Sequence, residues 1–270
     1  MVSRQKKEAD RGQFVVKKND LIRKTRYNLT AQQQKIILFA ISKITPEDDF
    51  DKEYSFDINE LAAACGIKLR DGGYYYSDLK GDIELLTKRD WCHMPDGVHM
   101  TMSWIGDAKI FDNDARITIR FNPNMKPYLF HLKTCYTRYR LENVLVFKGK
   151  YSIRLYEILR SHVNTIALED DLFEEQEVTL SLNEFRSQFD LEENYKRWVD
   201  IKRYVLDPAV KEINKRANDI HVEYTPMHGD HTRAIEKILF VITPAKPGQQ
   251  LNAKLERKEI LDHQTFDNQK

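Results

Sequence analysis

The sequence has 270 residues, enough for one large domain or two small ones, and 41% of them are hydrophobic, so the chain can bury a substantial core. It has only 10 glycines and 8 prolines, which excludes collagen-like, low-complexity and wholly disordered chains. No apolar stretch approaches the ~18 residues of a membrane span, Met1–Asp10 is polar, and the three cysteines are far apart, which predicts a cytoplasmic protein with no membrane partner.

Positive and negative charges nearly cancel, at a net +1, but they are segregated along the chain. Residues 1–29 hold nine Lys/Arg against three acids, 133–154 hold six against one, and 194–218 hold seven against three. Residues 169–177 carry six acids and no base. Basic stripes of this kind are typical of nucleic-acid binding, although ordinary surface patchiness explains them equally well.

The first half of the chain predicts helices, a short strand and hairpin strands in a fixed order. The cues are apolar spacings of three and four, alternation, and caps such as Asn28 or Thr30, Asp57 or Asn59, and Gly66. In order, the expected elements are a helix that stops before Pro46, a strand over 52–58, a helix over 60–65, a Gly- and Tyr-rich loop over 71–76, a helix over 77–90 opened by Ser77, and strands within 91–105 and 116–121.

The second half repeats this order. It predicts an amphipathic helix over 151–163 with Ile153, Tyr156 (or Leu155), Leu159 and Val163 inward, a strand over 176–182, a short helix over 184–189 capped by Asn183, a long helix from Asn194 or Tyr195 toward Ala217, and a hairpin of 220–224 and 235–242 with its tip at 228–230. Short segments of sequence repeat as well: Phe56–Leu61 is similar to Leu180–Phe185, and Asp78–Lys80 is similar to Asp200–Lys202.

A capped short helix, a turn, a longer helix and a β-hairpin form a helix-turn-helix with a wing. The sequence therefore predicts an α+β protein of two tandem winged-helix domains related by internal duplication. We expect a flexible basic tail (1–13), a first winged-helix domain (14–132), a basic linker (133–150), a second winged-helix domain (151–243) and a flexible tail (244–270).

The long helix of the second domain is the best candidate for reading DNA, because the second helix of a helix-turn-helix enters the major groove. One stripe is apolar (Trp198, Ile201, Val205, Ala209, Ile213), while Lys196, Arg197 and Arg203 gather on the exposed first two turns. Arg suits bidentate contact with guanine, and Lys suits phosphate. Lys202 falls near the core face, where its stem could pack. Pro208 either kinks the helix or starts a new one.

The wing and the first domain give weaker signals. His231 and Arg233 flank the wing tip and suit phosphate or the minor groove, but exposed hairpin polarity explains them equally well. In the first domain Lys80 is the only basic residue near the start of its helix, so this domain is either a weaker DNA contact or a protein interface. The candidate DNA-contacting residues are Tyr195, Lys196, Arg197, Lys202, Arg203, Arg233 and Lys80.

The run Tyr195–Asn214, with its Asp200-Ile201-Lys202-Arg203 and Asp207-Pro208-Ala209-Val210-Lys211-Glu212-Ile213-Asn214 segments, closely resembles the hallmark of the plasmid replication initiator (Rep) family, the iteron-binding theta-type initiators. The resemblance extends to Asn28–Thr30, Ile153–Leu159 and Ile235–Ile242 and covers roughly residues 14–243.

The resemblance implies binding to direct repeats (iterons) of double-stranded DNA at a plasmid origin, origin melting, recruitment of the host initiator and replicative helicase, and repression of the protein's own promoter by a homodimer. It implies that the second domain reads the major groove and that the first contributes backbone contacts and dimerisation. A winged-helix transcriptional repressor without initiator activity is the alternative.

No enzymatic activity, cofactor or metal is expected. The chain has no G-x-x-x-x-G-K-[ST] loop for a nucleotide and no His-x-His for a rolling-circle nickase, and the acidic run 169–177 lacks the pattern of a calcium loop. DNA melting would therefore rely on binding energy and a partner motor.

Overall fold

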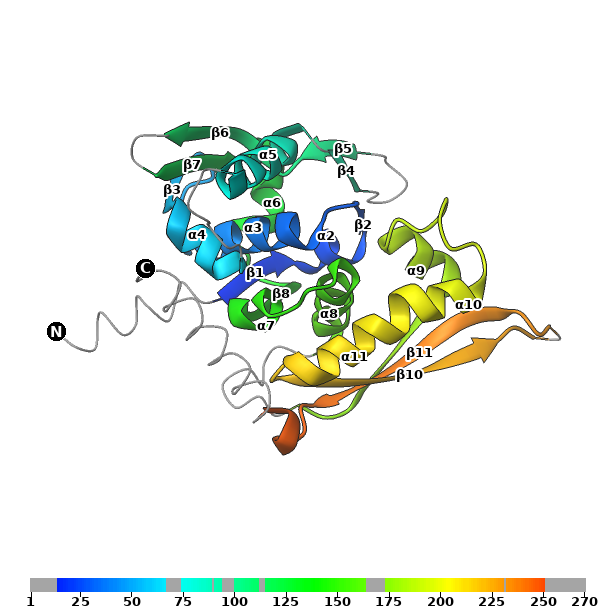
Figure 1. Cartoon of the computed structure of the whole chain (residues 1–270). Helices are drawn as coiled ribbons and strands as arrows, with labels where there is room; N and C mark the ends of the chain where they lie inside the picture. The colour runs from blue at the N-terminus through cyan, green and yellow to red at the C-terminus, as the bar shows by residue number, and fades with distance from the viewer. Residues whose placement is uncertain are drawn as a thin grey trace. The chain divides into compact units, whose positions relative to one another are not determined.

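The computed structural model describes residues 14–66, 74–88, 90–93, 100–111, 115–163, 173–230 and 232–250. The chain divides into two compact units with the boundary between Leu145 and Val146 (Figure 1). Of the two predicted flexible tails, residues 1–13 and 251–270 lie outside the described residues. Residues 244–250 are described, and they do not form a free tail, because Pro244 ends a strand and Ala245 and Gln249 are buried.

The first unit combines helices with two- and three-stranded antiparallel sheets. Its elements are β1 (Phe14–Lys18), α2 (Asn19–Arg23), β2 (Thr25–Arg26), α3 (Ala31–Ser42), β3 (Tyr54–Asp57), α4 (Ile58–Cys65), α5 (Tyr74–Lys88), β4 (Asp90–His93), β5 (Met100–Ser103), β6 (Ile105–Phe111), β7 (Arg116–Phe121), η2 (Pro123–Met125), α6 (Lys126–Leu129), β8 (Tyr136–Arg140) and α7 (Leu141–Leu145). The sheets have the orders β1-β8, β2-β4-β5 and β3-β7-β6.

Helix α3 lies at the centre of the first unit's core, with every residue from Gln33 to Ser42 buried. Thr30, and not Asn28, is its N-cap, because the Thr30 hydroxyl accepts the Gln33 N–H while the Gln33 side chain accepts the Thr30 N–H. Apolar residues fill most of the helix, so it packs against neighbours on several sides.

The first helix of the first unit's helix-turn-helix is capped by Asp57, which is one of the two predicted caps. The Asp57 carboxylate accepts the N–H groups of Asn59 and Glu60, so α4 begins at Ile58, and Gly66 ends it in the left-handed region at φ 70°. Helix α5 begins at Tyr74, three residues before the predicted Ser77, so part of the predicted loop is helical.

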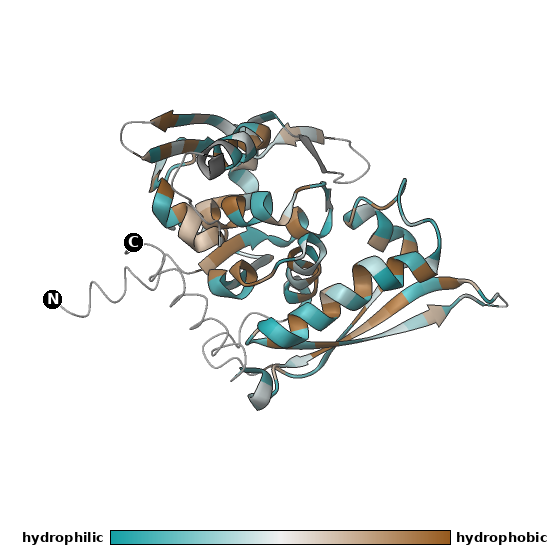
Figure 2. Cartoon of the chain, viewed as in Figure 1, coloured by the Kyte–Doolittle hydropathy of each residue, from teal (hydrophilic) through white to brown (hydrophobic). Residues whose placement is uncertain are grey.

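In the described residues of the second unit, one three-stranded sheet of order β10-β11-β9 has helices beside it. Its elements are α8 (Lys150–His162), β9 (Gln176–Ser181), α9 (Leu182–Gln188), α10 (Trp198–Ile201), η4 (Lys202–Leu206), α11 (Asp207–Arg216), β10 (Ile220–His228) and β11 (Ile235–Pro244). The hairpin strands are longer than predicted, and Ile238, Phe240 and Ile242 of β11 are fully buried. Figure 2 shows teal and brown residues alternating along α11, as expected for a helix with one buried face.

Both units build the same sheet. In each, the strand before the helix-turn-helix pairs with the second strand of the hairpin, giving β3-β7-β6 and β9-β11-β10. The similar segments also pair in the same way: Phe56 in the first unit lies opposite Ile117, and the corresponding Leu180 in the second unit lies opposite Ile238. This shared topology confirms two winged-helix domains and supports the predicted duplication.

Three local predictions for the second unit are wrong. Ser181, not Asn183, caps α9, in a capping box with Glu184. Helix α8 was predicted to have one buried and one solvent-exposed face, but every residue from Ser152 to Ser161 is buried. The long helix begins at Trp198, not at Asn194 or Tyr195.

The stretch 133–150, predicted as a basic linker, contains regular structure. Strand β8 lies within it and pairs antiparallel with β1 from Phe14–Arg140 to Lys18–Tyr136, and α7 follows directly. Arg138 and Arg140 lie over the Phe14 ring, with the Arg138 guanidinium carbon 3.7 Å from the ring centroid. Two of the basic residues of this stretch therefore lie on a strand.

Ser181→Ala is expected to destabilise the second unit by about 1 kcal/mol, because the Ser181 hydroxyl accepts the Glu184 N–H at the start of α9. Chemical unfolding of the full chain measures the loss. Asn183→Ala is the matched control, since Asn183 is an exposed residue of the same helix. An equal loss in both variants would remove the capping role of Ser181.

Candidate nucleic-acid interface

Elements α10, η4 and α11 form one continuous helical run alongside the hairpin β10–β11 (Figure 1). Its apolar stripe is buried as predicted at Ile201, Val205, Ala209 and Ile213, which are at most 1% exposed, whereas Trp198 is half-buried. The stripe fixes which face of the run points away from the core.

The run stays helical through Pro208 because it widens just before it. Residues 202–206 form a π turn, and the Asp207 N–H donates to the Lys202 carbonyl, five residues back. A proline lacks an N–H and its ring crowds the carbonyl four residues earlier, so a locally wider turn accommodates it. The helix therefore does not start anew at Asp207 as a cap, which was one of the two predicted outcomes.

The turn between α9 and α10 is fixed by Arg186 from the last turn of α9. Its guanidinium donates to the carbonyls of Tyr195 at 3.1 Å and Lys196 at 2.5 Å. Tyr195 has a left-handed backbone at φ 49°, which is costly for a bulky residue, and its ring stacks on Tyr204 at 5.8 Å between centroids. These contacts place Lys196 and Arg197 ahead of the helix, with Arg197 at the N-cap position.

Two of the predicted DNA-contacting cations are already paired with carboxylates of the same run. Arg197 donates from Nε and Nη2 to Asp200 at 2.8 and 3.0 Å, and this hydrogen bonding lowers the pKa of Asp200 below its ordinary value. The Lys202 ammonium donates to Asp207 at 2.7 Å and lies 5.8 Å from the centroid of the Tyr224 ring. The Lys202 side chain is 45% exposed, and its ammonium lies outside the core, between Asp207 and the Tyr224 ring.

The π turn explains the Lys202–Asp207 pair. Side chains five residues apart are not neighbours on an α-helix, where three and four are the close spacings. The i-to-i+5 geometry of a π turn brings them together. The Tyr224 hydroxyl also donates to Asp207, so this carboxylate ties the helical run to the first strand of the wing. Partial burial raises the pKa of Asp207, but the hydrogen bonds from Lys202 and Tyr224 outweigh it and the pKa is lowered.

Lys196 and Arg203 are exposed cations at the start of this run that remain available. Within the part of the chain that the structure describes, neither the Lys196 ammonium nor the Arg203 guanidinium forms a hydrogen bond or an ion pair; Arg203 lies 5.4 Å from the Tyr204 ring centroid. Asp200 is paired with Arg197, three residues before it, so the charge of this carboxylate is partly neutralised within the run.

Two exposed apolar side chains of the helical run were missed by the sequence analysis. Val199 is 64% exposed and follows Trp198 of the apolar stripe, and Tyr204 is 50% exposed and precedes Val205. A helical wheel places both residues outside the apolar stripe, so the sequence alone could have predicted that they are exposed. Arg186 left no comparable signal, because its partners are backbone carbonyls.

The remaining predicted site residues lie on other elements. Arg233 is exposed in the hairpin connection, where its carbonyl lies 2.9 Å from Nδ1 of His228. Lys80 is half-buried on α5 of the first unit. The structure thus brings Tyr195, Lys196, Arg197, Lys202 and Arg203 together, and leaves Arg233 at the wing tip and Lys80 in the other unit. His231 lies outside the described residues.

The far end of the run is anchored by carboxylates that point inward. The Glu212 carboxylate accepts the N–H groups of Lys148 and Gly149 at 2.8 and 3.0 Å, just before α8. Beyond α11, buried Asp219 accepts the Tyr156 hydroxyl at 2.7 Å and pairs with Nε of Arg160 at 3.2 Å. Helix α8 and the two residues before it therefore bind the C-terminal end of the run and the segment that follows it.

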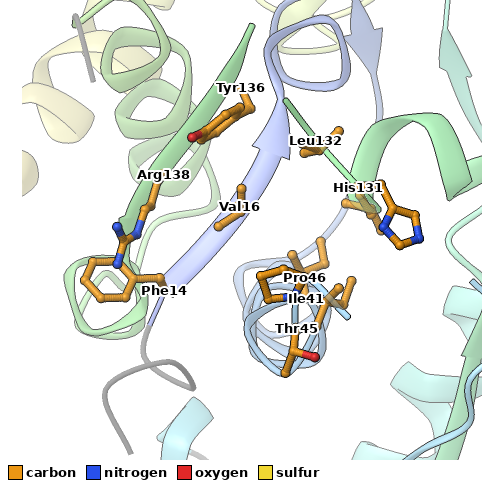
Figure 3. Close-up of a pocket in the computed structure, with 11 residues that line it drawn as sticks. Phe14, Val16, Ile41, Thr45, Pro46, His131, Leu132, Tyr136 and Arg138 are labelled. Carbon is orange, nitrogen blue, oxygen red and sulfur yellow. The ribbon is translucent and has the colours of Figure 1, made fainter. Parts of the chain in front are cut away.

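A cavity of about 360 Å³ lies in the first unit (Figure 3). Its lining is mainly apolar and includes Val16, Ile41, Pro46 and Leu132. The polar side chains of the lining do not converge on one point (Thr45, His131, Tyr136, Arg138). No group of three or more His, Cys, Asp or Glu side chains suited to a metal occurs in the described ranges. Across those same ranges, no helix is long and apolar enough to cross a membrane. The exposed face of the second unit's helical run remains the best-formed candidate site.

Taken together, two winged-helix domains and a helical run bearing exposed cations define a DNA-binding protein of the winged-helix class. Family models agree: one described as "Initiator Replication protein, WH1" matches residues 14–160, and one described as "Initiator Rep protein, WH2" matches residues 181–242. The chain belongs to this family of initiator replication proteins, and the resemblance predicted from Tyr195–Asn214 is confirmed.

Individual relatives point the same way. A "Replication initiation protein" of Escherichia coli is 30% identical over 212 residues, which cover 76% of this chain and 64% of that protein. The crystal structure of the Pi initiator protein in complex with iteron DNA matches with a TM-score of 0.68 at 18% identity, covering 87% of this chain and 99% of that one. The structural likeness supports the fold of two winged-helix domains.

Proposed function

We propose that this chain initiates plasmid replication by binding direct repeats at the origin. The observation that carries the proposal is the pair of unengaged cations, Lys196 and Arg203, on the exposed helical run of the second domain in a member of the initiator family. Arg203 reads base edges in the major groove, while Lys196 and Arg233 contact phosphate or the minor groove. The relative whose structure was solved with iteron DNA supports the same ligand class.

The pairs Arg197–Asp200 and Lys202–Asp207 stabilise the reading face, which is the exposed side of the helical run that carries Lys196 and Arg203. Tyr195 positions the turn, and Arg197 and Lys202 reach DNA only by exchanging Asp200 and Asp207 for phosphate. The first domain, including Lys80, supplies backbone contacts and a dimer interface. Two linked winged helices let one chain cover a site of roughly two helical turns without a symmetric partner.

The proposal includes the later steps of initiation. Bound protein promotes melting of neighbouring AT-rich DNA and recruits the host initiator and replicative helicase, while a homodimer represses the protein's own promoter. Catalysis is not part of the proposal, since strand separation is attributed to binding energy and to the recruited helicase.

Footprinting at increasing salt concentration, on the DNA next to the encoding gene, tests the proposal. Regularly spaced protection of direct repeats is the expected result. Protection of a single inverted repeat at the promoter would favour the alternative, a winged-helix repressor without initiator activity. Absence of specific protection at every salt concentration would contradict both functions.

Lys196→Ala is expected to reduce the slope of log affinity against log salt concentration by about 1, because one phosphate contact disappears. Fluorescence anisotropy on duplexes with and without the direct repeat measures the slope for both. Lys211→Ala, an exposed lysine further along the same run, is the control. A change confined to the repeat-containing duplex would contradict a phosphate role for Lys196.

A further inference from the structure

The exposed apolar residues of the protein are concentrated on one pair of elements. In the described ranges the exposed large apolar side chains are Leu85, Val199, Tyr204 and Met227, and the last three lie on the helical run and the wing of the second domain. Val199 is the most exposed of them, at 64%. Scattered exposed apolar residues are ordinary. Val199 is singled out because it lies on the proposed DNA-reading helix about one turn before Arg203 and is the most exposed of the four.

Val199 lies outside the buried stripe of the helical run and is 64% exposed. Its neighbours Trp198 and Asp200 are half-buried and Ile201 is fully buried, so the core stripe runs past it on the other side of the helix. Asp200 beside it is occupied by Arg197. The side chain therefore presents a branched apolar tip next to a neutralised carboxylate, and it cannot form a hydrogen bond with a base or phosphate.

Resting on the proposed function, we infer that Val199 selects a thymine in each direct repeat by contacting its 5-methyl group. That methyl is the apolar group that duplex DNA displays in the major groove, and it marks thymine among the four bases there. Valine is stiff at χ1, so the contact requires little ordering of the side chain.

The position of the thymine follows from the helix. Arg203 lies four residues after Val199, about 6 Å along the axis at 1.5 Å per residue. This distance spans about two base-pair steps of 3.4 Å. The selected thymine therefore lies within about two base pairs of the base pair that Arg203 contacts.

Replacement of single thymines by deoxyuridine tests the inference, because it removes only the methyl group. The probe is a duplex with one direct repeat located by footprinting, and anisotropy measures its affinity for the full chain. At one position the wild type is expected to lose about fourfold in affinity, the value for one buried methyl group. Val199→Ala is expected to bind the thymine and deoxyuridine duplexes equally at that position.

Leu85→Ala is the matched control, since Leu85 is an exposed apolar residue of a helix in the first domain, and it should keep the full deoxyuridine effect. Deoxyuridine sensitivity at no position, or sensitivity that persists in Val199→Ala, would overturn the inference while leaving iteron binding intact. Failure of the wild type to protect any direct repeat would overturn the proposed function and the inference together.

Discussion

Arg203→Ala is expected to lower the affinity for the direct repeat by about fivefold to 150-fold, equivalent to ~1–3 kcal/mol. The guanidinium is exposed on the outer face of the run, and within the described ranges it is not committed to a carboxylate. Truncation therefore removes a group available for bidentate contact with guanine, and breaks no ion pair that the protein itself uses. Competition binding against random duplex measures the loss.

Arg203→Lys separates base reading from charge, because lysine keeps the charge but cannot offer the two parallel donors of a guanidinium. It is expected to retain binding to random duplex and to lose most of the preference for the repeat. Equal losses of Arg203→Ala on specific and random DNA would contradict base reading and leave Arg203 as a phosphate contact.

Asp219→Ala is expected to destabilise the second domain by about 3–5 kcal/mol, the usual cost of removing one partner of a buried ion pair. Asp219 is 5% exposed, and its Oδ2 accepts the Tyr156 hydroxyl and pairs with Arg160, which is 3% exposed. The variant leaves the Arg160 guanidinium buried without this carboxylate. Urea unfolding, with amide hydrogen exchange of residues 173–250, measures the effect.

Combining Asp219→Ala with Arg160→Met provides the control, because the second change removes the stranded charge and keeps an apolar chain of similar length. The double variant is expected to recover a large part of the lost stability. If Asp219→Ala unfolds within about 1 kcal/mol of the wild type, the ion pair does not hold α8 to the segment that leads into β10.

The order of elements could be predicted because its signals are local. Asp57 and Gly66 delimit a helix through cap chemistry that acts within four residues. The stripe Ile201, Val205, Ala209, Ile213 follows from the 3.6-residue period alone. The repetition of these local signals in both halves led to two winged-helix domains, which the paired sheets and the family models confirm.

Helix α8 shows where local signals fail. Its polar residues Arg154, Glu157 and Arg160 suggest a solvated face, yet all three are buried. Arg154 donates to the Gln188 carbonyl, and Arg160 meets Asp219, in segments distant along the chain. A buried charge is tolerated only where such partners exist, and periodicity contains no information about them.

The sequence by itself determined the element order, the duplicated helix-turn-helix and wing, and the face of the second domain's long helix that points outward. Only the tertiary structure decided where that helix starts, through Arg186 on the carbonyls of Tyr195 and Lys196, and which cations remain unengaged. It paired Lys202 with Asp207 through the π turn and left Arg203 exposed. The physical reason is that propensity and periodicity act within one or two turns, whereas hydrogen bonds and ion pairs depend on which distant segments packing brings together.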